Sequence, residues 1–319
     1  MLKNKTICIT GGAGFIASHL IDAISQDNKI ILYDLFSRNA FQYVNAERKE
    51  NVVVIRGDVL DAELLTKSMA GCDTVIHCAA VAGIYSVIRN ATMTMKINFL
   101  GTYNALEAAV KNNVKHFVNF STSEVYGPHV YDGKEEDITT QGPMSEKRWI
   151  YAVSKLAAEH FSHTYEMEYG LKVATVRPFN IYGPRQVGEG AIREMILRAL
   201  KGDTLTVYND GTQIRSWCYV SDFIDAVTSI LEHEKAWGEV FNVGSPKETI
   251  SVLNLARTII RLAGSSSKIE FKKHPGPEVY LRVPNIGKAR RILGYEPRVE
   301  LEAGIGQTIE FYRQHLAIA

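Results

Sequence analysis

The sequence predicts an α/β fold in which a doubly wound parallel sheet is joined to a smaller, interleaved C-terminal α/β lobe. Up to Pro178, short runs rich in Val, Ile and Phe alternate with longer helical patterns. These runs do not alternate apolar with polar residues, which is typical of strands covered on both faces. After Pro178, glycine and proline become frequent and the strands are isolated. We therefore expect an N-terminal domain over 1–177, rejoined by about 213–244, and a lobe that is mainly 178–319.

Six runs of the N-terminal half are predicted to be strands: 6–10, 29–34, 51–58, 73–80, 115–122 and 172–178. The helical patterns between them cover 14–26, 61–70, 93–112 and 150–169. A late run, 239–245, is a candidate to rejoin the sheet. The helices 93–112 and 150–169 are more apolar than a helix with one solvated face, which predicts a homodimer through a four-helix interface. The alternative is that sheet and lobe bury both helices within one chain.

Composition narrows the class of protein. The 319 residues carry 36 basic and 35 acidic side chains, a net charge of +1, which gives no electrostatic case for nucleic acid or an anionic membrane. No apolar run is long enough to cross a bilayer, and no apolar signal segment precedes the first strand, so we expect a cytoplasmic protein. The four cysteines are scattered and form no Cys/His cluster with zinc-like spacing, so we expect reduced thiols and no metal.

A glycine-rich turn follows the first predicted strand directly. In the segment TGGAGFIAS (10–18), Gly11, Gly14 and Ala17 occupy the three small positions of a dinucleotide fingerprint, and Phe15 and Ile16 open the helix. The first small residue allows the tight turn, the second lets the backbone approach a pyrophosphate, and the third allows close helix–strand packing. Because the turn lies between a strand and a helix, it predicts a dinucleotide site rather than an ordinary loop.

The acid that ends the second strand indicates which dinucleotide is bound. Asp34 lies 20 residues beyond Gly14, where a carboxylate takes the ribose hydroxyls of NAD and repels a 2′-phosphate. Arg38 is the residue that would favour NADP instead. Asp58 and Val59 follow the third strand and are placed to meet the adenine, although Asp58 would also suit a helix cap. The sequence therefore predicts NAD as the cofactor.

A Tyr–Lys pair follows the fifth strand. That strand ends in STSEVYG (121–127), at the sheet edge where ligands bind in open α/β folds. Tyr151 and Lys155, in YAVSK, lie on the same face of the next helix. The ammonium group stabilises a phenolate, so the tyrosine can act as a base on a sugar hydroxyl, with Thr122 sharing the hydrogen bond.

These segments together resemble the extended short-chain dehydrogenase/reductases that act on nucleotide sugars, and the resemblance covers essentially the whole chain. Beside the segments quoted above, the matching ones are GDVLD, HCAA, INFLGTYNALEAA, RPFNIYGPR, RSWCYVSD and FNVGS. The resemblance implies a Rossmann sheet, bound NAD and oxidation at carbon 4 of the sugar. It also implies that Tyr151 is the base and that Lys155 binds the nicotinamide ribose.

The resemblance assigns roles to further residues. Ala79 and Ala80 would contact the cofactor, and Asn98 would stabilise the backbone of the active site. The residues expected to contact a nucleotide-sugar substrate, with a UDP-sugar favoured, are Ser123, Asn180, Arg185, Arg215 and Arg282. Of these, Arg215 and Arg282 match positions that hold the diphosphate, a role that suits a guanidinium fork.

The reaction after the first oxidation depends on the triplet Thr122, Ser123 and Glu124. A 4,6-dehydratase needs a base and an acid here, and the acid is replaced by serine. A 4-epimerase needs neither group. Glucuronate decarboxylases carry Thr-Ser-Glu, and RWIYAVSK (148–155) is most similar to that group, whereas VAGIYSVIRN (81–90) is not. Decarboxylation is the first expectation, with 4-epimerisation, dehydration or simple 4-oxidation as alternatives. A non-catalytic NAD-binding regulator would lack Tyr151, Lys155 or Thr122, and all three are present.

Overall fold

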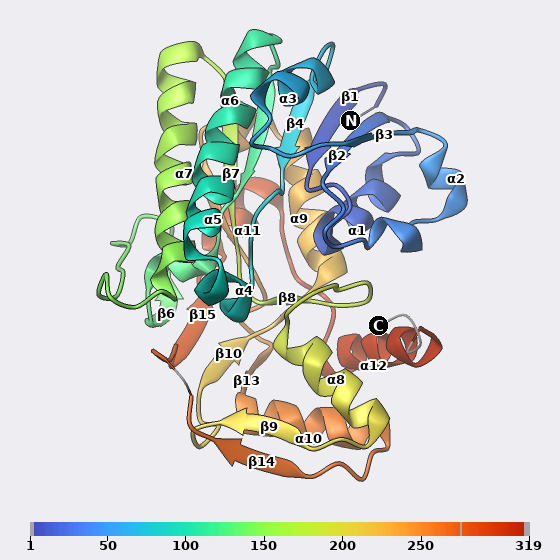
Figure 1. The fold of residues 1–319 in the computed structure, drawn as a ribbon, viewed down its shortest axis with the longest axis vertical. Coiled ribbons are helices and arrows are strands. Elements are labelled where there is room, and N and C mark those ends of the chain that lie inside the picture. Colours follow the sequence, from blue (N-terminus) through green and yellow to red (C-terminus); the bar gives the residue numbers. More distant parts are fainter. Residues whose placement is uncertain (1–2, 275, 316–319) are drawn as a thin grey trace.

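A computed structural model describes residues 3–274 and 276–315. Seven parallel strands form the central sheet in the order β12-β7-β5-β4-β1-β2-β3 (Figure 1). These strands are β1 (Thr6–Thr10), β2 (Lys29–Asp34), β3 (Val52–Arg56), β4 (Thr74–His77), β5 (His116–Phe120), β7 (Lys172–Pro178) and β12 (Val240–Val243). The strand order reverses between β1 and β4, so the loops after these strands diverge and leave a crevice at the carboxyl edge. The predicted doubly wound parallel sheet is confirmed.

Helices cover both faces of this sheet (Figure 1). One layer contains α3 (Ala62–Ser68), α6 (Gly101–Lys111) and α7 (Trp149–Tyr169), and α6 packs against both of the others. The other layer contains α1 (Phe15–Ile24), α9 (Val220–Glu232) and α11 (Gly287–Leu293), with α9 packed between the other two. The central strand β1 has burial on both faces, as Ile7, Cys8 and Ile9 are completely buried. This explains why the strand runs lack polar alternation.

The predicted helix 93–112 is not regular. The chain forms α4 (Ile84–Arg89) and α5 (Ala91–Met95), then a π-helical turn over Lys96–Leu100, and only then α6. A π turn widens the backbone ladder locally and is often found at functional sites. Here it contains Asn98, which is completely buried.

The C-terminal lobe is built around a four-stranded sheet in the order β13-β10-β15-β6. Its strands are β13 (Thr249–Ser251), β10 (Ile214–Ser216), β15 (Leu281–Pro284) and β6 (His129–Gly133), the last contributed by the N-terminal half of the chain. Two further strand pairs complete the lobe: β8 (Ile181–Tyr182) with β11 (Cys218–Tyr219), and β9 (Leu205–Tyr208) with β14 (Ile269–Lys272). Its helices are α8 (Ala191–Lys201), α10 (Val252–Ala263) and α12 (Leu301–Gln314). Short elements outside these layers include α2 (Ala46–Lys49) and two 3₁₀ turns, Phe41–Tyr43 and Glu234–Ala236.

A buried ion pair fixes α7 against the sheet. Arg177 on β7 donates from Nε and Nη2 to the two carboxylate oxygens of Glu159, at 2.9 and 2.7 Å. Its Nη1 donates to the Tyr126 hydroxyl at 2.7 Å and to the carbonyl of Glu135 at 3.1 Å. Tyr126 ends the 3₁₀ turn Ser123–Tyr126 after β5, and Glu159 lies one helical turn beyond Lys155. One guanidinium therefore joins the two segments that carry the proposed catalytic residues.

Removing Glu159 tests this ion pair. Both side chains are more than nine-tenths buried, so Glu159→Ala leaves a buried guanidinium uncompensated and should lower the free energy of unfolding by about 3–5 kcal/mol. The matched control is Glu234→Ala, which breaks the exposed pair with Lys172 and should cost less than about 1 kcal/mol. Urea denaturation followed by circular dichroism measures both. Equal losses for the two variants would contradict the structural role of the buried pair.

Candidate active site

The turn after β1 shapes a pocket at the carboxyl edge of the sheet. Gly11 has φ of 68°, and a Cβ placed there would lie 2.6 Å from the backbone nitrogen of Ala79. Neither a left-handed backbone nor this close approach suits a larger residue. Helix α1 begins immediately after Gly14 with no side-chain cap and no acid in its first turn. Its first N–H groups, beginning at Phe15 and Ile16, thus face the pocket as an anion site.

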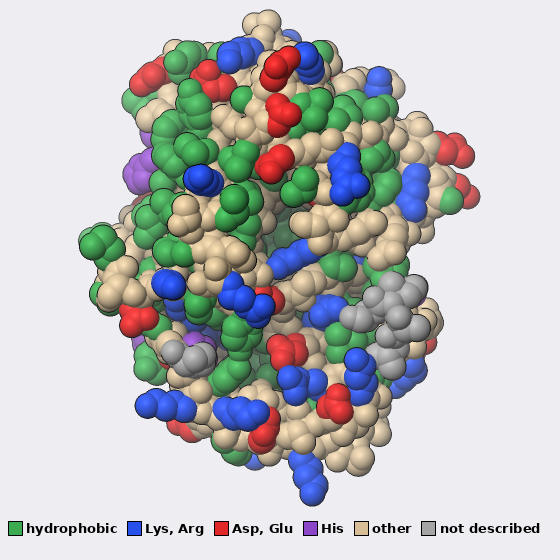
Figure 2. Space-filling view, in the orientation of Figure 1, with side chains coloured by type: hydrophobic (Ala, Val, Ile, Leu, Met, Phe, Trp, Pro, Cys, Tyr) green, Lys and Arg blue, Asp and Glu red, His purple; other side chains and the backbone are tan. Residues whose placement is uncertain are grey.

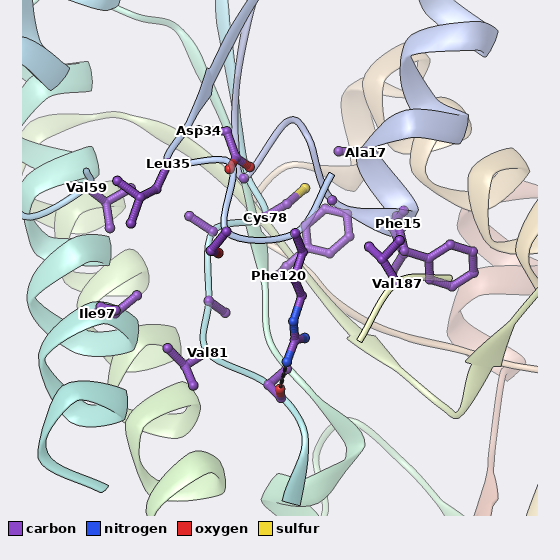
Figure 3. A pocket seen from close by; sticks show the side chains of 18 of the residues that line it. Phe15, Ala17, Asp34, Leu35, Val59, Cys78, Val81, Ile97, Phe120 and Val187 are labelled. Atoms are coloured by element: carbon purple, nitrogen blue, oxygen red, sulfur yellow. Dashed lines mark hydrogen bonds between the residues drawn. The ribbon is translucent and has the colours of Figure 1, made fainter. Parts of the chain in front are cut away.

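Asp34, labelled in Figure 3, lines the same pocket as Tyr151 and Lys155. Its carboxylate accepts hydrogen bonds from the backbone N–H of Ala13 at 3.0 Å and of Phe36 at 2.5 Å. Burial raises the pKa of Asp34, and these two bonds oppose the rise. A carboxylate oriented in this way offers its remaining lone pairs to ribose hydroxyls, which fits NAD.

The pocket has a volume of about 340 Å³ and contains nearly every residue expected to contact the cofactor. Figure 3 shows the wall formed by Leu35, Val59 and Ile97 on one side and by Phe15 and Val187 on the other. Ala79 and Ala80 also line it. Asp58 lines it too and accepts from the backbone N–H of Leu60 at 2.9 Å. The cap of α3 is Asp61, not Asp58, because Asp61 accepts from the N–H of Leu64.

Tyr151 and Lys155 enter this pocket from the first turns of α7. Lys155 is 1% exposed, and its Nζ has no hydrogen-bond partner within the described part of the chain. Burial lowers the pKa of Lys155 to about 8. Burial raises the pKa of Tyr151 to about 12, opposed by its hydrogen bond with Thr122. A buried ammonium with unused donors can bind the two hydroxyl groups of a ribose, so the residues of this pocket fit a dinucleotide.

Asn98 holds the backbone beside this pair. Its Oδ1 accepts from the N–H of Val81 at 2.7 Å, and its Nδ2 donates to the carbonyl of Val81 at 3.1 Å. Nδ2 also donates to Ser154 Oγ at 3.1 Å, and Ser154 lies on α7 next to Lys155. The π turn thus places one side-chain amide so that it bonds both the segment after β4 and α7, the helix that carries Tyr151 and Lys155.

A second, larger cleft of about 630 Å³ lies between the two lobes. Figure 2 shows this face of the molecule hollowed between the lobes, with Lys and Arg side chains around the hollow. Of the predicted substrate residues, Asn180, Arg215 and Arg282 line it together with Glu124. Asn180 has its Nδ2 committed to the carbonyl of Ser216 at 2.8 Å. Arg215 pairs with Glu278 at 3.5 Å and donates to the carbonyl of Val279.

Two predicted substrate residues lie elsewhere. Arg185 lines neither pocket, because its guanidinium pairs with Asp22 on α1 at 2.5 Å and donates to the carbonyl of Ser18. Ser123 is 4% exposed and lines neither pocket. The structure therefore brings together the other predicted substrate residues without these two.

Glu124 lies among arginines at one end of the larger cleft. Arg282 Nη1 donates to its Oε1 at 2.6 Å, and Arg148 Nη2 does so at 3.3 Å. Arg282 also donates to the carbonyl of Gly127 at 2.6 Å. Burial would raise the pKa of Glu124, but the charges of Arg282 and Arg148 outweigh it, so the pKa is lowered. Arg282 therefore contacts the strand end that carries Glu124, whereas the sequence suggested a place at the diphosphate.

Arg148 is the residue of this cluster that sequence reasoning did not include among the site residues. Its side chain is 7% exposed and donates to the carbonyl of Pro277 as well as to Glu124. Two signals in the sequence pointed to it: its position three residues before Tyr151, and the similarity of RWIYAVSK (148–155) to glucuronate decarboxylases. Within residues 3–274 and 276–315, no group of His, Cys, Asp and Glu side chains could hold a metal ion. Over the same residues, the helices are all too short or too polar to cross a bilayer.

Lys155 makes the stability of the cofactor-free protein depend on pH. Its folded pKa of about 8 lies below its value of about 10.4 in an unfolded chain. Between these values the unfolded state binds a proton that the folded state does not, so stability rises with pH. Lys155→Met removes the buried charge and should be more stable than wild type at pH 7, with the difference shrinking as the pH rises from 8 to 10. Urea unfolding of NAD-free protein across this range measures it, and pH-independent differences would contradict the burial argument.

Comparisons with known proteins agree with this geometry. The model of the NAD dependent epimerase/dehydratase family matches residues 7–244. The UDP-N-acetyl-alpha-D-glucosaminuronate decarboxylase of Bacillus cytotoxicus is 36% identical over 97% of this chain and 98% of its own length. UDP-glucuronic acid decarboxylase 1 of Xenopus tropicalis is 34% identical over 98% of this chain and 73% of its own.

Solved structures give the same result. The UDP-glucuronic acid 4-epimerase of Bacillus cereus, in complex with UDP-glucuronic acid and NAD, superposes with a TM-score of 0.88 at 30% identity, over 97% of this chain and 99% of that one. The UDP-glucose 4-epimerase of Thermotoga maritima superposes with a TM-score of 0.89 at 30% identity, over 98% and 99%. The expected relation to enzymes that modify nucleotide sugars is confirmed. This chain belongs to the NAD-dependent epimerase/dehydratase family of enzymes, and its cofactor is NAD.

Proposed function

We propose that this enzyme decarboxylates a UDP-hexuronate through a 4-keto intermediate, with UDP-glucuronate as the first candidate substrate. The observation that carries the proposal is the cluster around Glu124. Arg148, Arg215 and Arg282 gather there against two carboxylates, Glu124 and Glu278, so the cluster is net positive. A buried cationic cluster at the end of a sugar cleft suits a substrate that carries its own carboxylate.

The same cluster argues against a dehydratase. That reaction needs Glu124 to remove the proton on carbon 5. Two guanidinium groups lower the pKa of Glu124, which makes its carboxylate a weaker base. The serine at position 123 also lacks the acid that would protonate a leaving hydroxyl.

The residues of the two pockets divide the proposed chemistry between them. When bound, NAD⁺ supplies the hydride acceptor for carbon 4 and later returns the hydride. Tyr151 takes the proton of the 4-hydroxyl, Thr122 shares its hydrogen bond, and the ammonium of Lys155 favours the phenolate. Gly11, Gly14 and Asp34 would hold the dinucleotide at its phosphates and ribose.

The 4-keto sugar is a β-keto acid, so the arginines need only orient its carboxylate for loss of carbon dioxide. The bond between carbon 5 and the carboxyl carbon breaks, and its electron pair moves into the 4-keto group as carbon dioxide leaves. A proton then takes the vacant position on carbon 5. Arg282 and Arg148 would orient the carboxylate before the bond breaks. Arg282 and Arg148 suit this role better than Arg215, because they share the single carboxylate of Glu124 and each keeps an Nε without a hydrogen-bond partner among the described residues, whereas Arg215 pairs with Glu278.

A 4-epimerase of the same uronate is the second candidate. The solved structure of the Bacillus cereus UDP-glucuronic acid 4-epimerase superposes over nearly the whole chain, and the cleft of about 630 Å³ suits a substrate that must turn over. An epimerase would keep the carboxylate that a decarboxylase releases. The two reactions are therefore separated by their products.

Carbon dioxide release from UDP-glucuronate and from UDP-N-acetylglucosaminuronate tests the proposal. Wild type should release one carbon dioxide for each pentose product, and Arg282→Ala should lose roughly 10²-fold or more in kcat, because a charged contact to the reacting carboxylate is removed. Tyr151→Phe should lose about 10²–10⁴-fold while retaining NAD.

The control is Arg215→Ala, which lies in the same cleft and should raise KM more than it lowers kcat. Glu124→Gln separates the alternatives further. It should trap bound NADH with a 4-keto sugar in a dehydratase and have only a modest effect in an epimerase. A wild-type enzyme that converts either uronate only to its carbon-4 epimer, with no carbon dioxide, overturns decarboxylation in favour of the epimerase.

We further propose a cytoplasmic homodimer that forms through α6, α7 and the π turn between α5 and α6. The described surface of these elements exposes Leu100, Tyr103 and Val153, each about 40% accessible, and α6 packs directly on α7 (Figure 1). Apolar side chains gathered on two adjacent helices favour a partner surface of the same kind. A reducing compartment is supported by the four cysteines, all of which are free thiols.

Leu100→Arg combined with Val153→Arg should convert the dimer to a monomer, because two charges would have to be buried at the interface. Light scattering coupled to gel filtration measures the mass at micromolar concentration. The control is Ile138→Arg, a more exposed position in the segment before α7, which should leave the mass unchanged. A monomeric wild type would refute the proposed assembly.

A further inference from the structure

An arginine side chain bridges two loops across the phosphate-binding turn. Arg38 follows β2, and its Nη2 donates to the carbonyl of Ala82 and to Ser86 Oγ, both at 3.2 Å. Ala82 and Ser86 follow β4. Because β1 lies between β4 and β2 in the sheet, the loops after β2 and β4 flank the loop after β1, which is the turn Gly11–Gly14. Arg38 and Ala82 line the same pocket as Gly11 and Gly14.

The far end of this bridge is anchored by a third segment. Ser86 Oγ donates to Glu189 Oε1 at 2.6 Å, which leaves the hydroxyl oxygen able to accept from Arg38. Glu189 also accepts from the backbone N–H groups of Ser86 and Tyr85, each at 2.8 Å. Gly83 makes this approach possible, since a Cβ there would lie 2.7 Å from the Glu189 carboxyl carbon. Three loops are thus joined over the cofactor pocket, and both Arg38 and Glu189 line it.

Arg38 meets the carboxylate of Glu189 only through the Ser86 hydroxyl. No ion pair joins it to a carboxylate in residues 3–274 and 276–315, although its side chain is partly buried. Its two printed hydrogen bonds both come from Nη2, so donors on the other nitrogens are left for a ligand. The neighbouring helix α1 likewise has an uncapped N-terminus and no acid in its first turn. Both features favour an anion in the space between them.

We propose that Arg38 contacts the diphosphate of NAD and, together with Ser86 and Glu189, forms a strap that retains NAD through turnover. The strap would have to open before the dinucleotide leaves, so the hydride taken from carbon 4 is returned in the same binding event. This assignment rests on NAD as cofactor and is independent of the proposed decarboxylation. It also separates Arg38 from the 2′-hydroxyl of the adenosine ribose, where Asp34 lies, and hence from a role in selecting NADP.

The test compares ligands that contain or lack a diphosphate. Arg38→Ala, Arg38→Lys and the charge-matched control Arg56→Ala are stripped of cofactor and titrated calorimetrically with NAD, NADP, ADP and adenosine. Arg56 is exposed and does not line the pocket. Arg38→Ala should weaken NAD and ADP about 10–100-fold, the usual effect of losing hydrogen bonds from a charged group. Adenosine should change less than about 2-fold, Arg38→Lys should fall between, and Arg56→Ala should match wild type.

Retention is measured separately, as the rate at which prebound NADH fluorescence is lost during a chase with NAD. Ser86→Ala keeps the guanidinium and its bond to the Ala82 carbonyl but removes the hydroxyl that links it to Glu189, so NADH should leave several-fold faster. An unchanged release rate in Ser86→Ala overturns the strap. Equal weakening of adenosine and ADP by Arg38→Ala would show that the side chain only maintains the pocket and would overturn the diphosphate contact. A selective loss of NADP binding would assign Arg38 to the 2′-phosphate instead.

Discussion

The fork of Arg177 on Glu159 is the contact on which the geometry of the active site depends. Tyr151 and Lys155 lie on α7, whereas Thr122 and Glu124 lie at the end of β5, and these segments are separate in the sequence. Arg177 pairs with Glu159 on the helix and donates to Tyr126 on the 3₁₀ turn after β5. Because the ion pair is buried, a shift of either segment would expose an unpaired charge to the protein interior. The position of Tyr151, the proposed base, relative to Thr122 and Glu124 is therefore set by a contact outside both pockets.

Two kinds of buried charge distinguish the two pockets. In the cofactor pocket Lys155 is buried and its Nζ has no hydrogen-bond partner among the described residues, a costly arrangement that a ligand with hydroxyl groups would relieve. In the larger cleft Glu124 is partly buried, and its single negative charge faces two positive ones, since Arg282 and Arg148 both contact it. The first arrangement fits a ribose and the second fits an anionic sugar. The cofactor pocket therefore offers unused hydrogen-bond donors, whereas the larger cleft offers excess positive charge.

The reaction is decided by few residues on a widely shared scaffold. The relatives at 30–36% identity include both decarboxylases and 4-epimerases, so the fold alone does not select the outcome. The two reactions differ in what happens after carbon 4 is oxidised: a decarboxylase releases the carboxylate of the sugar, and an epimerase keeps it. Two arginines pair with Glu124, which makes its carboxylate a weaker base. The same pairing holds positive charge in the larger cleft. The strap of Arg38, Ser86 and Glu189 acts on a different property, the time that the dinucleotide stays bound.

The sequence by itself determined the sheet, the NAD site and the Tyr–Lys pair, because these depend on local patterns: buried strand runs, small residues in a tight turn, and a four-residue helical spacing. It did not reveal the π turn at Asn98, whose apolar pattern resembles that of a regular helix, or that Asp61 caps α3. Tertiary packing alone decided which carboxylate each arginine contacts. Arg185 pairs with Asp22, and Arg282 pairs with Glu124. Arg148, at the start of α7, contacts the same Glu124 carboxylate. A long charged side chain has no periodicity that fixes its partner, so its role depends on which distant carboxylate the fold brings within reach.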